Sequence, residues 1–427
     1  MLNQNRFSKF FFYLLILFLP TQFGKHFWPQ FSFIQGFRLD YLSPTIYLTD
    51  ILIILIIIFS KEKIITFFKK QNKKNILLIF LLFLSLFIGV INSENPKAGL
   101  YGILKITEYL FLGIYIITSF ENLSKKYILS ILFFGVIFES ALSFLQVFKN
   151  GSLNGIFYFL GERFFNSQTP GIANASVNGQ LFLRPYATFS HPNALAGYLI
   201  FAMAFITVYK KYVSSKIFFL TILIGSMTLL LTLSRIAILT WIIYLIFLFC
   251  VPFFKKYKNN ISNKNVATGI SAVILLIFLM FAFFQNTLFV QRFIKTRIVE
   301  ESFVQREYLI NQSLNMFNKN PVFGVGVNNY YNNLEKSKEK TLFIQPVHNI
   351  FLLVLSETGL IGITYFLFIF YKALKSAFVN NKKINSFVLT TLLIILGMFD
   401  HYFLTLQQGQ IMFVLILCHA FSVKIRK

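Results

Sequence analysis

The sequence is short of charge. Only 13% of its 427 residues are charged, whereas 56% are hydrophobic. A soluble domain is usually about 25% charged, so this composition excludes an ordinary water-facing surface and favours a chain built for lipid. Acids are the scarcer sign, with 15 Asp and Glu against 40 Lys and Arg. Because the basic residues gather in short segments between apolar runs, membrane topology explains them and no nucleic-acid partner is expected.

Residues for metals, disulfides and nucleotides are also few. Asp occurs only at positions 40, 50 and 400, and no clustered His/Asp spacing is visible, so no metal site is expected. Cys250 and Cys418 both lie in apolar runs, which makes a structural disulfide unfavourable. No P-loop or dinucleotide fingerprint is present. The sequence therefore predicts no cofactor.

Long apolar runs dominate the rest of the chain. A run of roughly 17 to 25 apolar residues crosses a bilayer as a helix. The sequence predicts one integral-membrane domain over residues 1–427, an all-α polytopic membrane protein with about twelve transmembrane helices. The predicted spans are 10–28, 44–60, 76–92, 99–119, 127–148, 193–209, 216–233, 236–252, 266–285, 348–371, 385–401 and 409–423.

The distribution of Lys and Arg predicts the orientation. Most basic residues fall in the short loops and end segments that lie inside if both termini are cytoplasmic. Two segments on the other side are long, namely a first external loop over 149–192 and a large external loop over 286–347. Long ordered loops in compact proteins tend to carry function. We therefore expect the active site on the outer face of the membrane.

The large external loop contains candidate residues. Residues 303–317 have apolar residues at near-helical spacing, which predicts an amphipathic helix on the membrane surface that stops at Asn320-Pro321. Arg306 lies near its start, where it binds an anionic group or pairs with a nearby acid. His348 and Asn349 precede an apolar run, so His348 is either a polar cap or a base, and Asn349 beside it is expected to contact the substrate. Glu357 lies deeper in that run and is expected to tie helices together.

Further candidates lie around the first external loop. Arg184 and His191 could face a ligand together with Asn193, but Pro192-Asn193 is equally typical of a helix start. Arg235 is almost embedded in apolar sequence and needs an anionic partner, for which a phosphate is suitable. Lys105 and Glu108, three residues apart, can neutralise each other on one helical face.

Four segments in order resemble the superfamily of O-antigen ligases and O-antigen polymerases, which are bacterial cell-envelope membrane proteins. They are RPYATFSHPNALAGYL at 184–199, LLTLSRIAIL at 230–239, Arg306 followed by NPVFGVGVNNY at 320–330, and HNIFLLVLSETGLIG at 348–362. Ile236 departs from the family, which usually has a small residue there.

The resemblance implies a GT-C-like membrane glycosyltransferase of the bacterial cytoplasmic (inner) membrane. Its donor would be a glycan linked to undecaprenyl pyrophosphate, and its acceptor a glycolipid, a glycan or a protein. By the same resemblance, Arg235 and Arg306 would hold the pyrophosphate and His348 would help to activate the acceptor hydroxyl. Arginines can stabilise a leaving pyrophosphate without a metal ion.

Several alternatives remain at this point. Within the same superfamily, the chain could be a repeat-unit polymerase or a protein O-oligosaccharyltransferase, because the sequence does not name the acceptor. A flippase or transporter of lipid-linked glycans belongs to a different class and should carry polar groups near the bilayer midplane. A scaffold without chemistry would leave Arg235 unexplained. The candidate charges gather on the outer side, which favours an enzyme.

Overall fold

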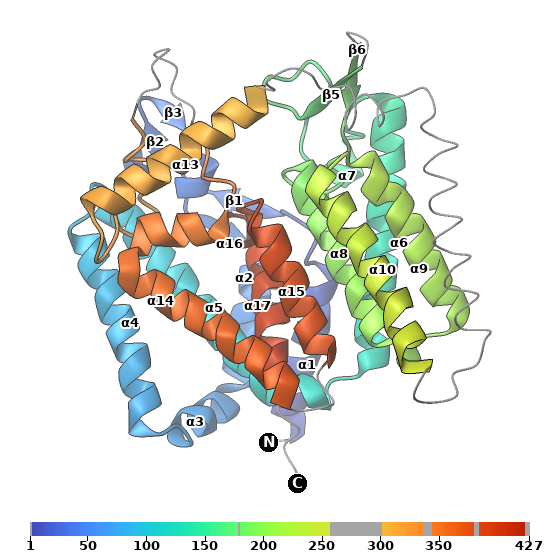
Figure 1. The fold of residues 1–427 in the computed structure, drawn as a ribbon, viewed down its shortest axis with the longest axis horizontal. Coiled ribbons are helices and arrows are strands. Elements are labelled where there is room, and N and C mark those ends of the chain that lie inside the picture. The colour runs from blue at the N-terminus through green and yellow to red at the C-terminus, as the bar shows by residue number, and fades with distance from the viewer. Residues whose placement is uncertain (1, 178–179, 257–300, 336–343, 380–383, 423–427) are drawn as a thin grey trace. The chain divides into compact units, whose positions relative to one another are not determined.

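The computed structural model describes residues 2–177, 180–256, 301–335, 344–379 and 384–422. Its described part is mostly helical (Figure 1). The chain divides into two compact units: unit 1 comprises Met1–Leu132 and Glu300–Lys427, and unit 2 comprises Phe133–Val299. The expected single domain over 1–427 stays a prediction.

Four described helices are long and apolar enough to cross a membrane. They cover Lys73–Ile91, Pro96–Asn122, Lys125–Lys149 and Ile350–Ser376. Shorter apolar helices occupy Leu48–Phe59, Pro192–Val208, Ser215–Leu231, Arg235–Ile246, Ser386–Gly397 and Gln407–Phe421. The helices and their composition confirm a helical membrane protein. Every predicted span except 266–285 overlaps a described helix, and 266–285 lies outside the described residues; the total of twelve stays a prediction.

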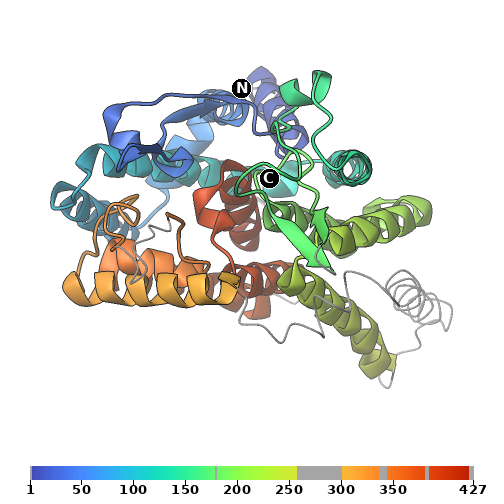
Figure 2. The same ribbon diagram turned by 90° about the horizontal axis from the view of Figure 1, so that it is seen from above.

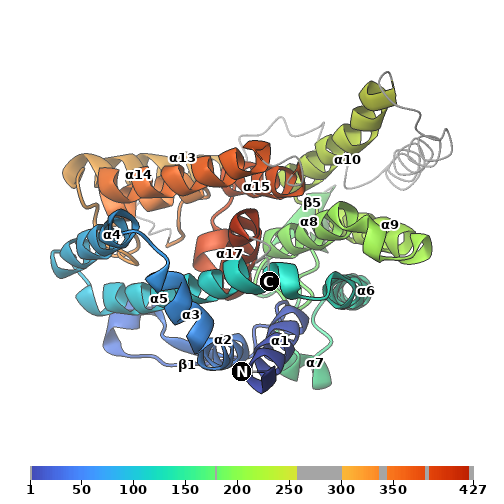
Figure 3. The same ribbon diagram turned by 90° about the horizontal axis from the view of Figure 1, so that it is seen from below.

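Unit 1 contains both ends of the chain. Its N-terminal helices are α1 (Leu2–Leu17), α2 (Leu48–Phe59), α3 (Lys61–Lys69), α4 (Lys73–Ile91), α5 (Pro96–Ser119) and the start of α6 (Lys125–Lys149). Its C-terminal helices are α13 (Glu301–Lys319), α14 (Ile350–Val379), α15 (Ile384–Gly397), α16 (Tyr402–Thr405) and α17 (Gln407–Phe421). Helix α1 lies beside α2 (Figure 3), and α17 packs between α5, α14 and α15.

The first predicted span was placed too far along the chain. Helix α1 ends at Leu17, and Pro20 lies in the turn that follows it. Residues 24–47 then form two small antiparallel pairs, in which β1 (Gly24–His26) pairs with β4 (Thr45–Tyr47) and β2 (Phe33–Ile34) with β3 (Phe37–Arg38). The prediction extended the span through Pro20, whereas proline cannot donate the backbone hydrogen bond that a continuing helix requires.

Helix α13 confirms the helix predicted at 303–317, and it ends at Lys319 before Asn320-Pro321, as expected. It runs alongside α14 (Figure 2). The face that packs on the protein carries Leu309, Gln312, Ser313 and Met316, all buried. The predicted apolar stripe lies elsewhere, because Ile310 and Leu314 are each 40% exposed. The stripe is therefore open to the surroundings of unit 1 rather than part of its core.

Helix α14 is broken at Gly359, whose φ of 62° and ψ of −161° are not helical. The freed backbone groups pair with residues 320–326. Val325 N donates to Ser356 O at 2.9 Å, Gly326 N to Glu357 O at 3.0 Å, and Leu360 N to Pro321 O at 2.8 Å. A Cβ on Gly359 would lie 2.4 Å from Val322 O, and one on Gly324 would lie 2.4 Å from Thr358 N. Glycine is required at both positions because two backbones meet there.

The segment after this contact also anchors helix α5. Asn329 is fully buried; its Oδ1 accepts from Asn95 N at 2.7 Å, and its Nδ2 donates to Asn95 O at 3.1 Å. Asn95 in turn caps α5 by accepting from Ala98 N at 3.2 Å. Glu357 accepts from Tyr330 N at 3.4 Å. Glu357 therefore ties a loop to a helix, close to the helix-tying role expected for it.

Unit 2 contains most of α6, the short helix α7 (Ile156–Phe159), the hairpin of β5 (Asn174–Val177) and β6 (Gln180–Leu183), and helices α8 (Pro192–Val208), α9 (Ser215–Leu231) and α10 (Arg235–Lys256). Helices α8, α9 and α10 pack on one another. Buried polar groups fasten the first external loop to α6. Glu139 accepts from Thr188 N at 3.1 Å and from Thr188 Oγ1 at 2.9 Å, and Gln146 Oε1 accepts from Ala187 N at 2.7 Å.

Candidate functional site

His348 lies immediately before helix α14 in unit 1. Asn349 caps this helix, because its Oδ1 accepts from Phe351 N at 2.8 Å and from Leu352 N at 3.0 Å. Its Nδ2 donates to Met398 O at 3.0 Å, which ties the start of α14 to the end of α15. These contacts fix the position of the neighbouring imidazole. The expected substrate contact of Asn349 stays a prediction.

Asp400 faces His348 across this junction. The distance from His348 Nδ1 to Asp400 Oδ1 is 3.4 Å, with the two side chains 18% and 11% exposed. This separation is within ion-pair range, but the angles do not make a hydrogen bond, and Nδ1 is buried without such a partner among the described residues. Active-site hydrogen bonds are often loose in structures without ligand and tighten on binding, so a small rotation of either side chain would complete this one. The pair is therefore arranged for a carboxylate to orient an imidazole.

A second histidine completes the cluster. The ring of His401 lies 4.9 Å from that of His348, and its Nδ1 lies 2.6 Å from Thr405 Oγ1. The backbone N of His401 donates to Asp400 Oδ1 at 2.8 Å, which holds the carboxylate in place. Tyr41 packs edge-on against His401 and stacks on Tyr331 with ring centroids 5.2 Å apart.

The cluster of His348, Asp400 and His401 was missed in the sequence. One potential ligand atom from each residue lies within 4.8 Å of the others, so the three could also hold a metal ion. The sequence showed Asp400-His401 only as the end of a predicted span. These residues lie more than 50 positions after His348, so there is no local spacing to detect. The arrangement offers two chemistries, a carboxylate-oriented base or a three-ligand cation site.

Arg306 lies on α13 of unit 1 and is half-buried. Within the described part of the chain, no hydrogen bond or ion pair of its guanidinium is found. A planar guanidinium with open donors is suited to binding two phosphate oxygens at once. The alternative in which Arg306 pairs with a neighbouring acid has no support among the described residues.

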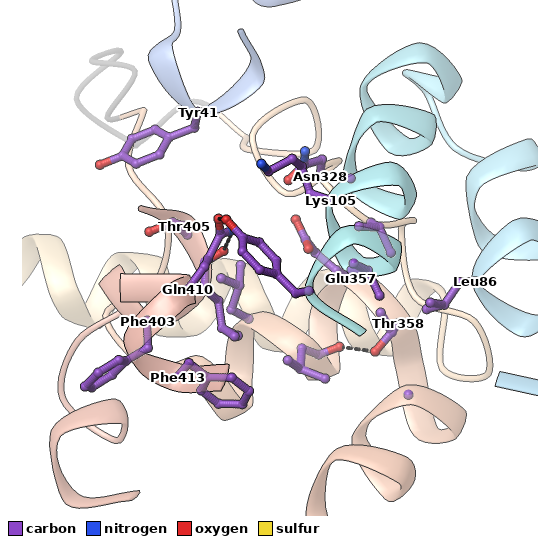
Figure 4. Close-up of a pocket in the computed structure, with 18 of the residues that line it drawn as sticks. Tyr41, Leu86, Lys105, Asn328, Glu357, Thr358, Phe403, Thr405, Gln410 and Phe413 are labelled. Atoms are coloured by element: carbon purple, nitrogen blue, oxygen red, sulfur yellow. Dashed lines mark hydrogen bonds between the residues drawn. The ribbon is translucent and has the colours of Figure 1, made fainter. Parts of the chain in front are cut away.

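Unit 1 also contains a partly open cavity of about 340 Å³ (Figure 4). Its walls come from the segment before α2, from α4, α5, α14, α16 and α17, and from the loop at 327–331. Lys105, Asn328 and Glu357 lie on one wall, and Gln410, Phe403 and Phe413 lie on the facing wall (Figure 4). Tyr41 and Thr405 belong to its lining and both contact His401, so the cavity adjoins the histidine cluster.

A buried ion network lies beside the cavity. Lys105 Nζ lies 2.6 Å from Glu108 Oε2, as the spacing predicted, and 2.7 Å from Asp50 Oδ1, which the spacing did not predict. The hydroxyl oxygen of Tyr109 lies 2.6 Å from Gln407 Oε1 and 2.9 Å from Gln410 Oε1. Its single proton is shared between these two acceptors. The network thus joins α2, α5 and α17.

Arg235 begins helix α10 in unit 2, directly after a turn in which Leu233 has a positive φ of 51°. Arg184 is buried and supports this turn, since its Nε donates to Thr232 O at 2.6 Å and its Nη2 to Asn193 Oδ1 at 2.7 Å. His191 caps α8 by accepting from Asn193 N at 3.1 Å. The helix start expected at Pro192-Asn193 is confirmed, whereas substrate binding by Arg184, His191 and Asn193 stays a prediction.

The candidate residues thus fall into two groups. The structure brings His348 together with Asp400 and His401 in unit 1, and Arg184 together with His191 and Asn193 in unit 2. Arg235 belongs to unit 2, and Arg306 and His348 belong to unit 1. The expectation that Arg235, Arg306 and His348 share one cavity stays a prediction.

Residues 218–367 match the model of a protein family described as O-antigen ligase. The match includes three of the four segments that suggested this superfamily, together with Arg235, Arg306 and His348, and it confirms that resemblance. Members of this family are glycosyltransferase-like ligases and polymerases that act on lipid-linked glycans and glycan acceptors in membranes. A comparison with curated proteins finds no match to this chain.

Proposed function

We propose that this chain transfers a glycan from undecaprenyl pyrophosphate to an acceptor hydroxyl on the outer face of the bacterial cytoplasmic membrane. The observation that carries the proposal is that the imidazole of His348 faces the carboxylate of Asp400, and that His348 lies within the segment 218–367 that matches the O-antigen ligase family. The transfer forms a bond between the acceptor oxygen and the anomeric carbon of the glycan. It breaks the bond from that carbon to the phosphate oxygen, whose electron pair leaves with undecaprenyl pyrophosphate.

In this mechanism His348 takes the proton of the acceptor hydroxyl as the new bond forms, and later releases it to water. Asp400 orients the ring and stabilises the imidazolium that results, as a buried carboxylate does for a histidine base in other enzymes. Arg306 and Arg235 bind the pyrophosphate and stabilise the charge that develops on the leaving group. His401 and Asn349 keep the base and its carboxylate in position.

The membrane orientation belongs to the same proposal. The start of α1 and the end of α17 lie at one end of unit 1, and α13 lies at the other (Figure 1). This arrangement supports the orientation predicted from basic residues, with both termini cytoplasmic and α13 outside. We further propose that the exposed side chains of Ile310 and Leu314 rest on the outer leaflet.

The envelope glycan of a deletion strain tests the function. If the protein is a ligase, lipid-linked polymer should accumulate when the gene is deleted, and the wild-type gene should restore transfer of the polymer. Accumulation of single repeat units would identify a repeat-unit polymerase instead, and loss of sugar from proteins alone would identify a protein O-oligosaccharyltransferase. If the protein is a flippase, the deletion strain would accumulate donor on the cytoplasmic face of the membrane. The purified protein would then form no glycosidic bond in detergent.

We also propose that transfer needs no divalent ion. The described structure offers one three-residue donor set, and our mechanism uses its histidine as a base. Purified enzyme is therefore expected to keep its rate in EDTA, measured as glycan transferred per minute. If EDTA abolishes transfer and added zinc, magnesium or manganese restores it, then His348, Asp400 and His401 hold a cation and the base mechanism is wrong.

A further inference from the structure

The side chains that line the cavity of unit 1 do not carry the charges that a phosphate-binding site requires. Its ionisable lining consists of Asp40, Lys105 and Glu357, apart from tyrosines. Lys105 is the only cation among them, and its ammonium is already held by Asp50 at 2.7 Å and Glu108 at 2.6 Å. Among the described residues of the lining, a pyrophosphate would meet carboxylates and no open guanidinium or ammonium. Electrostatics therefore disfavours the charged part of the donor here.

The lining is well suited to a different ligand. Ligand pockets combine apolar and aromatic walls with a few polar groups that fix orientation, in volumes of about 300–1,000 Å³. Tyr41 and Tyr331 stack on each other at one edge, and Asn328 and Gln410 contribute amides. Sugars present hydroxyls to amide groups and the apolar faces of their rings to aromatic side chains.

The rest of the lining is apolar and is supplied by helices. Leu82 and Leu86 come from α4, Ile369 from α14, and Phe413 and Val414 from α17. A free sugar would leave these side chains without a partner, whereas a hydrocarbon chain would cover them. The ligand that suits both parts of the lining is amphiphilic, with an uncharged polar head and an apolar tail.

The position of the cavity connects it to the proposed base, His348. Thr405 and Tyr41 line it and touch His401, whose ring contacts that of His348. We propose that this cavity binds the acceptor as a neutral glycolipid, with its sugar beside the histidine cluster and its chain along α4, α14 and α17. This inference rests on the proposed function, because it assigns the second substrate of that reaction.

The test uses a photoreactive octyl β-glucoside that carries a diazirine on its sugar, added to the full chain in lipid nanodiscs without donor. Peptides from α14 and α17 that line the cavity should be labelled. Unlabelled octyl β-glucoside should compete, while octyl phosphate and octanol should compete at least about tenfold more weakly, a difference of about 1.4 kcal/mol. Equal competition by octanol would indicate a pocket for lipid chains alone, and equal competition by octyl phosphate would indicate an anion site. Either result overturns the proposal.

A filling variant makes the test specific to the cavity. Val354→Phe places an aromatic ring in the lining, and Leu367→Phe adds the same ring on the same helix at a side chain that is 50% exposed and does not line the cavity. Labelling should fall about tenfold or more in Val354→Phe and persist in Leu367→Phe. If Val354→Phe fails to fold, Leu86→Phe fills the cavity from α4. Unchanged labelling in a folded filling variant refutes the site.

The outcome is distinguishable from a failure of the proposed function. Labelling is measured without donor, so it reports the cavity even if no glycan is ever transferred. Conversely, if wild-type enzyme transfers glycan and Val354→Phe leaves the KM for the acceptor unchanged, the reaction stands and the cavity assignment falls.

Discussion

At the scale of single residues, the chemistry depends on His348 and on the groups that hold it. Polar residues before an apolar run are visible in the sequence, so His348 and Asn349 were predicted at the mouth of a helix. The carboxylate that faces His348 was not, because Asp400 comes from another helix end and its approach depends on how α14 and α15 pack. The second partner of Lys105, Asp50, was not predicted for the same reason, since it lies on a different helix from Lys105 and Glu108.

Replacing Asp400 by Asn should slow transfer without weakening donor binding. The change keeps the shape of the side chain but removes the charge that stabilises the imidazolium. A charge-assisted hydrogen bond contributes about 1.5–3 kcal/mol, so the turnover number should fall about tenfold or more. Kinetics of the purified variant would show it as a loss in kcat at constant donor KM. Glu335→Gln, at an exposed carboxylate, is the control and should keep the wild-type rate. A wild-type kcat for Asp400→Asn would remove Asp400 from the mechanism.

Replacing the buried Arg184 by Ala should lower the stability of the protein. Arg184→Ala leaves the carbonyl of Thr232 and the amide of Asn193 without these donors. An unsatisfied buried polar group costs about 1–3 kcal/mol, so the unfolding temperature in detergent should drop. Arg163→Ala is matched to it, because Arg163 is exposed and its bond to Ser190 O is long at 3.4 Å. An equal unfolding temperature for the two variants would mean that Arg184 does not support the turn before Arg235.

At the scale of elements, the organising contact joins the break in α14 to residues 320–326. Both segments were recognisable in the sequence, but their pairing was not. A helix break at Gly359 has no local cause that periodicity could reveal; it is stabilised by backbone hydrogen bonds from a loop about 35 residues earlier. The helix α13 was predicted correctly from its spacing, whereas its buried face was not, because spacing alone does not say which side meets protein and which meets lipid.

Gly359→Ala should disrupt this contact. The added Cβ would lie 2.4 Å from Val322 O, and alanine disfavours a φ of 62°. Strained backbone of this kind costs of order 1–3 kcal/mol before the clash is counted. We expect lower thermal stability and faster proteolysis within 320–335 than in the wild type. Leu360→Ala, at the next and exposed position, provides the comparison. If both variants resist protease equally, the pairing is not what holds the loop.

At the scale of the whole molecule, hydropathy and charge predicted a helical membrane protein, and the family match agrees. The match runs from residue 218 to residue 367 and so covers parts of both units. Sequence reasoning succeeded where the signal is local, in helix positions and motif order. It could not supply the cavity of unit 1, because its walls come from helices far apart in the chain.

The most direct test of the account separates donor binding from transfer in His348→Ala. Variants that insert and fold normally would be measured for binding of lipid-linked glycan and for its transfer. We expect His348→Ala to bind donor nearly as well as the wild type but to transfer it at least about 100-fold more slowly, because only the base is lost. Arg306→Lys should show weakened donor binding, since lysine lacks the planar fork. If His348→Ala transfers at the wild-type rate, or loses donor binding altogether, His348 is a polar residue at the start of α14 and not the base.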